Sequence, residues 1–120
     1  MISYALVFLG GGLGSTCRYG IAHLLAQYKL TFPLATLLAN VLSCILLGWL
    51  VGLSLRGQAN DTSKFLVMTG FCGGFSTFST FTNETFSLLQ SGHIGLGLLN
   101  IGGSLLLCLG CIYIGIRMGM

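Results

Sequence analysis

The chain has 120 residues, of which 54% are hydrophobic and only 6% are charged, and its formal net charge is +3. A soluble domain of this length carries about 25% charged residues, which wet its surface. Five basic and two acidic residues are too few for that. The composition therefore excludes a soluble catalytic domain and a basic nucleic-acid-binding surface, and it predicts an all-α integral membrane protein.

Four membrane-spanning helices would use nearly the whole chain as a single membrane domain, residues 1–120. The apolar stretches predict spans over about 3–26, 33–55, 64–90 and 94–117. The first stretch has no basic n-region and no small-residue cleavage site, so we interpret it as a retained span rather than a signal peptide. Short breaks, including the hydrophilic segment 56–64, separate the spans.

The distribution of lysine and arginine bears on orientation. Four spans place both termini on one side, together with Arg56, Lys64 and Arg117, whereas Lys29 lies on the other side. This modest bias favours cytoplasmic termini but permits insertion in both orientations. Two oppositely inserted copies could form an antiparallel dimer.

Small residues are abundant in the predicted spans. Several of the nineteen glycines form small-x-x-x-small pairs, which predict close helix packing within or between subunits; these are Gly10/Gly14, Gly48/Gly52, Gly70/Gly74 and Gly115/Gly119. The five cysteines form no C-x-x-C pair and are interpreted as packing residues.

Polar groups inside a membrane are costly and mark candidate functional positions. Arg18 lies in the first span, and its side chain either extends to the membrane interface or has a functional role. In the second case it would attract anions in a vestibule or stabilise a dimer interface. Asn40 lies on a helical stripe with Thr36 and Ser43, either as a helix–helix hydrogen-bonding group or as a pore-lining donor. Asn100 and Ser104 form a similar stripe, which Cys108 and Cys111 continue.

The third span contains the least helical segment. Residues 70–84 read GFCGGFSTFSTFTNE, a glycine pair followed by serine, threonine and phenylalanine, all of which lower helix propensity. A broken helix at membrane depth must be buried or line a polar cavity. Carbonyl groups freed at such a break are natural Na⁺ ligands.

Phenylalanine recurs every three residues beyond the glycine pair, at Phe75, Phe78 and Phe81, beside a polar stripe that includes Thr80 and Glu84. The edge of an aromatic ring carries partial positive charge. Ring edges together with hydroxyl and amide donors can replace part of an anion's hydration shell with weak contacts, as conduction requires. The alternative is that these rings only pack against lipid or other helices.

Three segments resemble motifs of the Fluc/CrcB fluoride channel family. They are GGGLGSTCRY at 10–19, TLLAN at 36–40 with Leu47-Gly48, and GGFSTFSTF at 73–81. The resemblance covers the whole chain in length, number of spans and order of motifs, and the third segment is its most specific part.

This resemblance implies two subunits in opposite orientations that enclose fluoride pathways, with a structural Na⁺ at the dimer centre. The Na⁺ ligands would be the backbone carbonyls of Gly73 and Ser76, and Arg18 would lie in a vestibule. The fluoride pathway would comprise Asn40, Phe78, Phe81, Ser79, Thr80, Ser104 and Glu84. The expected function is passive, fluoride-selective export across the inner membrane of a bacterial cell, without enzymatic activity.

Two rival functions remain open on the residues. A small proton-coupled exporter of cationic compounds would need a membrane-embedded acid in its first helix, where this chain has Arg18 instead. A non-transporting subunit of a larger membrane complex would tolerate replacement of Asn40, Phe78 and Phe81. The partner in the dimer is expected to be a second copy of the chain or a paralogous subunit.

Overall fold

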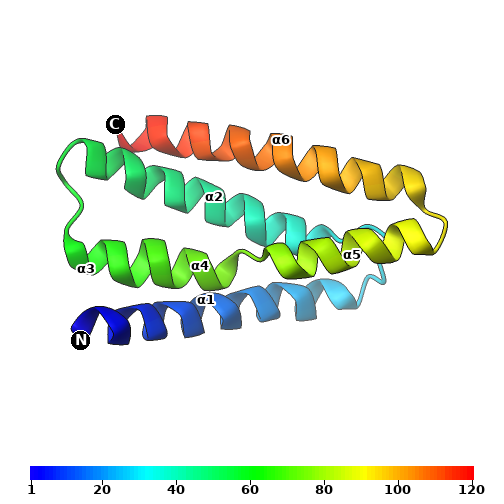
Figure 1. Cartoon of the computed structure of the whole chain (residues 1–120), viewed down its shortest axis with the longest axis horizontal. Coiled ribbons are helices and arrows are strands. Elements are labelled where there is room, and N and C mark those ends of the chain that lie inside the picture. The colour runs from blue at the N-terminus through cyan, green and yellow to red at the C-terminus, as the bar shows by residue number, and fades with distance from the viewer.

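The computed structural model describes all residues 1–120, and every regular element is helical. The helices form four rods that lie side by side in a bundle with a longest dimension of 48 Å (Figure 1). Three rods are single helices: α1 (Ile2–Ala26), α2 (Leu34–Leu55) and α6 (Ile94–Gly119). The third rod in chain order is divided into α3 (Asp61–Ser63), the π-helix η1 (Lys64–Cys72), α4 (Gly73–Phe75) and α5 (Phe78–Gln90). The ends of the four predicted segments agree with these bounds to within three residues.

The rods pack as two parallel pairs, α1 with η1 and α4, and α2 with α6. Both chain termini lie at the end of the bundle that also carries the α2–α3 loop (Figure 1). Glycines make these contacts close, because a Cβ on Gly48 would overlap the Ile112 carbonyl and a Cβ on Gly14 would overlap the Phe71 carbonyl. All four predicted glycine pairs therefore serve packing within the subunit.

The outer surface of the bundle is strongly apolar. Phe8 is 80% exposed on α1 and Leu106 is 75% exposed on α6, and similar side chains surround the bundle. Helices α2 and α6 are each long and apolar enough to cross a membrane. The helices of the third rod are individually short, because the rod is interrupted. A contiguous apolar surface of this kind marks contact with lipid or with another protein.

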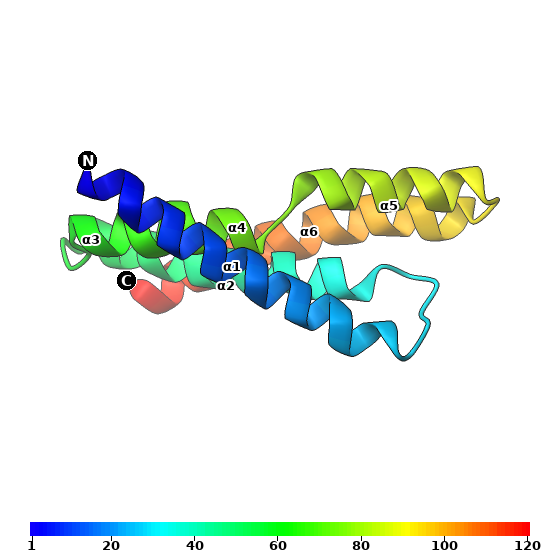
Figure 2. The same ribbon diagram turned by 90° about the horizontal axis from the view of Figure 1, so that it is seen from below.

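The third rod is broken, as predicted, at the C-terminal end of the predicted segment Gly73–Ser76. Gly73 begins the α4 turn, whereas the chain becomes extended at Ser76 (φ −81°, ψ 157°) and Thr77 (φ −152°, ψ 126°). Gly74 is needed for packing instead, since a Cβ there would overlap the Gly11 carbonyl of α1. Figure 2 shows the resulting offset between α4 and α5.

The expected alignment of three phenylalanines along one side is wrong for the first of them. Phe75 lies before the break, is buried, and packs on Phe71 with ring centroids 5.3 Å apart. Phe78 and Phe81 lie beyond the break on α5, with centroids 5.7 Å apart. The extended residues between α4 and α5 reset the helical phase, so the spacing of three cannot continue through them.

Candidate functional site

The break is held by the side chain of Asn40 on α2. Its Oδ1 accepts a hydrogen bond from the Thr77 N–H (2.8 Å), and its Nδ2 donates to the Thr77 carbonyl (3.3 Å). Backbone groups without partners at membrane depth cost several kcal/mol each, so these two bonds replace those that the interrupted helix has lost. The amide keeps one N–H that Thr77 does not use. Asn40 can therefore hold the break and still offer a donor.

The same rearrangement frees carbonyl groups. In an unbroken α-helix the Gly73 carbonyl would accept from the Thr77 N–H, which here donates to Asn40. The Ser76 carbonyl would accept from the Thr80 N–H, which here donates to the Thr77 hydroxyl (3.2 Å) as a helix cap. Gly73 is also exposed, with open space where a Cβ would stand. Both carbonyls predicted as Na⁺ ligands have thus lost their helical partners.

Arg18 contacts the break from the other side. Its Nε donates to the Gly74 carbonyl (3.1 Å), and the side chain is half-buried. A charged donor makes a stronger hydrogen bond than a neutral one. Arg18 therefore stabilises the C-terminal end of α4 rather than simply extending to the interface.

A cavity of about 210 Å³ opens beside the break. Helices α2, α5 and α6 and the extended residues supply its lining: Asn40, Cys44, Ser76, Thr77, Phe78, Phe81, Ser104, Leu105 and Cys108. None of these side chains is a carboxylic acid or a basic group. The cavity thus combines amide, hydroxyl and aromatic groups around a space without a fixed charge.

The two phenylalanines differ in exposure. Phe78 is 76% exposed, whereas Phe81 is half-buried, and their ring planes are inclined by 41°. A large aromatic side chain that is exposed beside the cavity leaves the cavity open on that side. A second subunit or lipid must cover it in the membrane.

Ser104 belongs to a buried chain of hydrogen bonds behind the cavity. Its hydroxyl donates to Asn100 Oδ1 (3.1 Å), Asn100 Nδ2 donates to the Thr85 hydroxyl (2.8 Å), and Thr85 donates to the Phe81 carbonyl (2.8 Å). Asn100 is only 1% exposed. The network ties the α6 side of the cavity to the turn of α5 that carries Phe81.

The structure brings together four of the seven predicted pathway residues, Asn40, Phe78, Phe81 and Ser104. Ser79 and Thr80 lie next to the cavity through their hydroxyl contacts with Thr77, at 3.3 and 3.2 Å.

Glu84 lies apart and lines two other pockets near the α1–α2 loop, and its buried Oε1 atom has no hydrogen-bond partner.

Four residues of the cavity lining are not among the predicted site residues: Cys44, Thr77, Leu105 and Cys108. Thr77 directly follows the predicted Na⁺ ligand Ser76, and its backbone is the point that Asn40 holds. Cys44 and Cys108 were interpreted as packing residues, yet both line the cavity. The available signal was their spacing, four residues beyond Asn40 and Ser104 respectively, which places each on the same helical face as its polar neighbour.

Comparison with known proteins shows the family of the chain. Residues 5–116 match the family described as CrcB-like protein, Camphor Resistance (CrcB). The chain belongs to the CrcB family. A relative from Pyrococcus horikoshii, named fluoride-specific ion channel FluC, is 45% identical over 112 residues, which cover 92% of this chain and 90% of the relative.

Further CrcB relatives with the same name confirm the extent of the match. The protein of Thermus thermophilus is 42% identical over 120 residues, covering 99% of this chain and 96% of its own length. That of Phocaeicola vulgatus is 44% identical over 93 residues, covering 77% of each chain. The match therefore includes the break and all four rods.

Proposed function

We propose that this chain forms a fluoride-selective channel that exports fluoride by passive electrodiffusion. The observation that carries the proposal is the uncharged cavity beside the helix break, in a chain that belongs to a family whose relatives are named fluoride-specific ion channels. The function is transport and not catalysis. As a member of this family the chain is a membrane protein.

The cavity offers fluoride several weak contacts. Asn40 has a free N–H, and the Phe78 and Phe81 rings can present edges that carry partial positive charge. Because the lining has no cation, an entering anion is stabilised without being trapped. Ser79, Thr80 and Glu84 would extend the route along α5, and Arg18 would favour anions at its mouth.

Fluoride stays weakly held in such a site and can leave along the electrical gradient. A membrane potential that is negative inside drives an anion outward, at about 2.3 kcal/mol per charge for each 100 mV. The location that we propose is the inner membrane of a bacterial cell, which the chain would cross several times. Its four rods then act as four spans, with the third broken where it lines the pathway.

The Gly73 and Ser76 carbonyls fit a structural Na⁺ ion. Hard cations bind oxygen ligands, and carbonyls at unwound helices supply them in membrane proteins. One subunit offers too few ligands to replace the ion's hydration shell. A second subunit in the opposite orientation would contribute the same carbonyls across a two-fold axis, and Na⁺ would then hold the two breaks together.

Two features support that antiparallel dimer. Gly73 is exposed with open space around it, and Phe78 is 76% exposed although it lines the cavity. A partner subunit would cover both. The partner is a second copy of this chain or a paralogue.

The decisive experiment is fluoride efflux from liposomes containing the purified protein, read with a fluoride electrode after addition of a potassium ionophore. Fast efflux of fluoride, with no chloride efflux under matched conditions, is the expected result. Absence of fluoride efflux, both alone and with a co-expressed paralogue, would remove the channel function. Proton-driven uptake of a cationic dye without fluoride efflux would support the exporter instead.

A further inference from the structure

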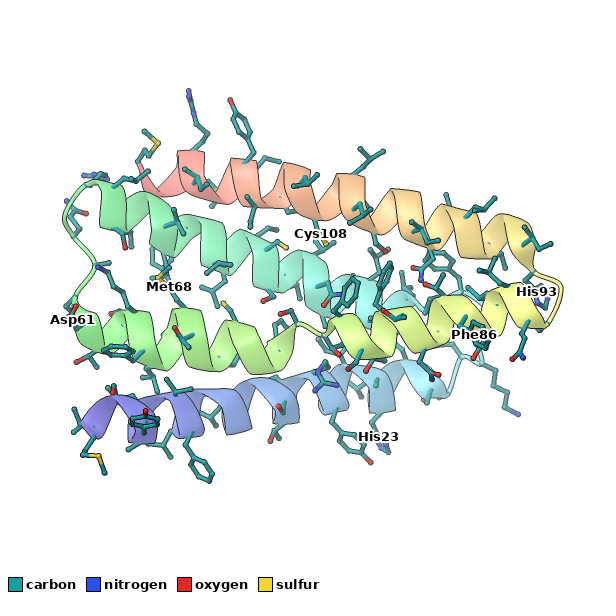
Figure 3. All side chains as sticks on the ribbon, in the orientation of Figure 1. His23, Asp61, Met68, Phe86, His93 and Cys108 are labelled. Carbon is teal, nitrogen blue, oxygen red and sulfur yellow. The ribbon has the colours of Figure 1, made fainter.

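Two cysteine thiols face the cavity from neighbouring helices. Cys44 lies on α2 and Cys108 on α6, and both are half-buried and line the same space as Asn40 and Ser104. The two helices pack against each other along their length, and neither thiol is part of a disulfide. Figure 3 shows Cys108 on the side of α6 that faces α2. Two thiols that converge on a shared cavity form a potential pair of ligands.

The number of ligands limits what this pair can bind. No group of three or more His, Cys, Asp or Glu side chains in the chain is arranged to hold a metal ion. A tetrahedral Zn²⁺ site, which uses four ligands or three with water, is therefore not available. Soft thiolates select soft ions such as Cu⁺, and ions of this class accept two sulfur ligands in a line.

We infer that Cys44 and Cys108 form a binding site for a univalent soft metal ion, Cu⁺ or Ag⁺, and that the bound ion blocks the fluoride pathway. Only the claim that the bound ion blocks fluoride rests on the proposed channel function. The site itself depends on the position of the two thiols.

Binding requires no redox step. Each thiol loses one proton and forms one sulfur–metal bond, so two protons are released and the bound bis-thiolate centre carries a net charge of −1. The ion occupies part of a cavity of about 210 Å³ that Phe81 and Ser104 also line. Fluoride is then excluded by volume and by like-charge repulsion.

Inhibition by Ag⁺ tests the site in the intact protein. Fluoride efflux from liposomes is measured in nitrate salts over a series of Ag⁺ concentrations, for the wild type and for Cys44→Ala and Cys108→Ala. Each comparison uses the efflux of the same variant without Ag⁺. The second thiol binds an ion that the first thiol already holds. Removal of either thiol should therefore raise the half-inhibiting concentration of Ag⁺ by roughly 100-fold.

A matched variant separates this pair from the other thiols. Replacing Cys17, Cys72 and Cys111 with alanine leaves only the pair, and this variant should keep wild-type sensitivity to Ag⁺. A wild type that conducts fluoride and is insensitive to Ag⁺ would overturn the inference. Wild-type inhibition in the double variant lacking Cys44 and Cys108 would overturn it as well.

Direct binding keeps the two hypotheses distinguishable. If the wild type does not conduct fluoride, the proposed channel function is refuted. The metal site is then tested only by the amount of Ag⁺ bound per chain. The variant that retains only Cys44 and Cys108 should bind one Ag⁺ per chain in competition with a small thiol, and should show a new sulfur-to-metal absorption band. Absence of both signals would refute the site whatever the transport result.

Discussion

At the scale of single residues, Asn40 has two tasks that substitution can separate. An aspartate would still accept a hydrogen bond from the Thr77 N–H but could not donate to the Thr77 carbonyl, and it would add negative charge to the cavity. Like charges about 4 Å apart repel by roughly 4 kcal/mol at an intermediate dielectric constant. We therefore expect Asn40→Asp to lower fluoride efflux from liposomes at least about tenfold.

Asn83→Asp is the matched control, because Asn83 is exposed on α5 and lies outside the cavity. It should conduct like the wild type. Wild-type efflux in Asn40→Asp would remove the Asn40 side chain from the pathway, whatever its role at the break.

Phe81 allows a test of the aromatic contribution. Phe81→Ile keeps much of the bulk of the side chain but removes the ring edge, so efflux should fall sharply while the protein still purifies as a folded species. Phe86→Ile is its control, since Phe86 is 58% exposed on the same helix and does not line the cavity (Figure 3). Equal efflux in the two variants would count against an aromatic pathway.

At the scale of helices, glycines set how closely α2 and α6 approach. A Cβ on Gly48 would overlap the Ile112 carbonyl, whereas a Cβ on Gly110 would meet nothing within 4 Å. Overpacking of a tight contact costs about 1–3 kcal/mol. Gly48→Ala should therefore lower the midpoint of thermal unfolding in detergent, measured by loss of the monodisperse peak in size-exclusion chromatography.

Gly110→Ala should leave that midpoint unchanged or raise it, because alanine favours a helix over glycine by up to about 1 kcal/mol. A drop in midpoint for both variants would mean that exposed glycines of α6 pack against something outside the subunit.

The helices also show what sequence patterns could and could not predict. The four apolar segments and their ends were predictable, because the length of a membrane span and the polar residues between spans define them. The break was predicted from composition over Gly73–Ser76. Its true position, at Ser76 and Thr77, depends on Asn40, which is distant in sequence.

The candidate site was predictable to a similar extent. The polar groups were found because such residues are costly inside a membrane, and the phenylalanines from their spacing of three residues and the resemblance of their segment to the family motif. Cys44 and Cys108 were not, because cysteine is an ordinary packing residue and only the α2–α6 contact brings these two into one cavity.

At the scale of the whole molecule, insertion in both orientations is testable in cells. In a variant otherwise free of cysteine, Ser91→Cys and Asn60→Cys each place one exposed thiol at opposite ends of the bundle. An impermeant maleimide applied to intact cells should label about half of either variant, since the weak charge bias permits both orientations. Complete labelling of one variant and none of the other would establish a single orientation.

The hydrogen bonds from Asn40 to Thr77 also constrain the order in which the protein is built. As the chain leaves the ribosome, α2 enters the membrane before the break does, so its amide group is in place when the exposed backbone at Thr77 arrives. A circular permutant that starts at Asn60 and joins the old termini, which share one end of the bundle, would reverse this order (Figure 1). Its yield in membranes should fall well below that of a permutant opened at residues 27–33, in which α2 still comes first. We therefore expect biogenesis of this small protein to depend on the direction of synthesis as well as on its final contacts.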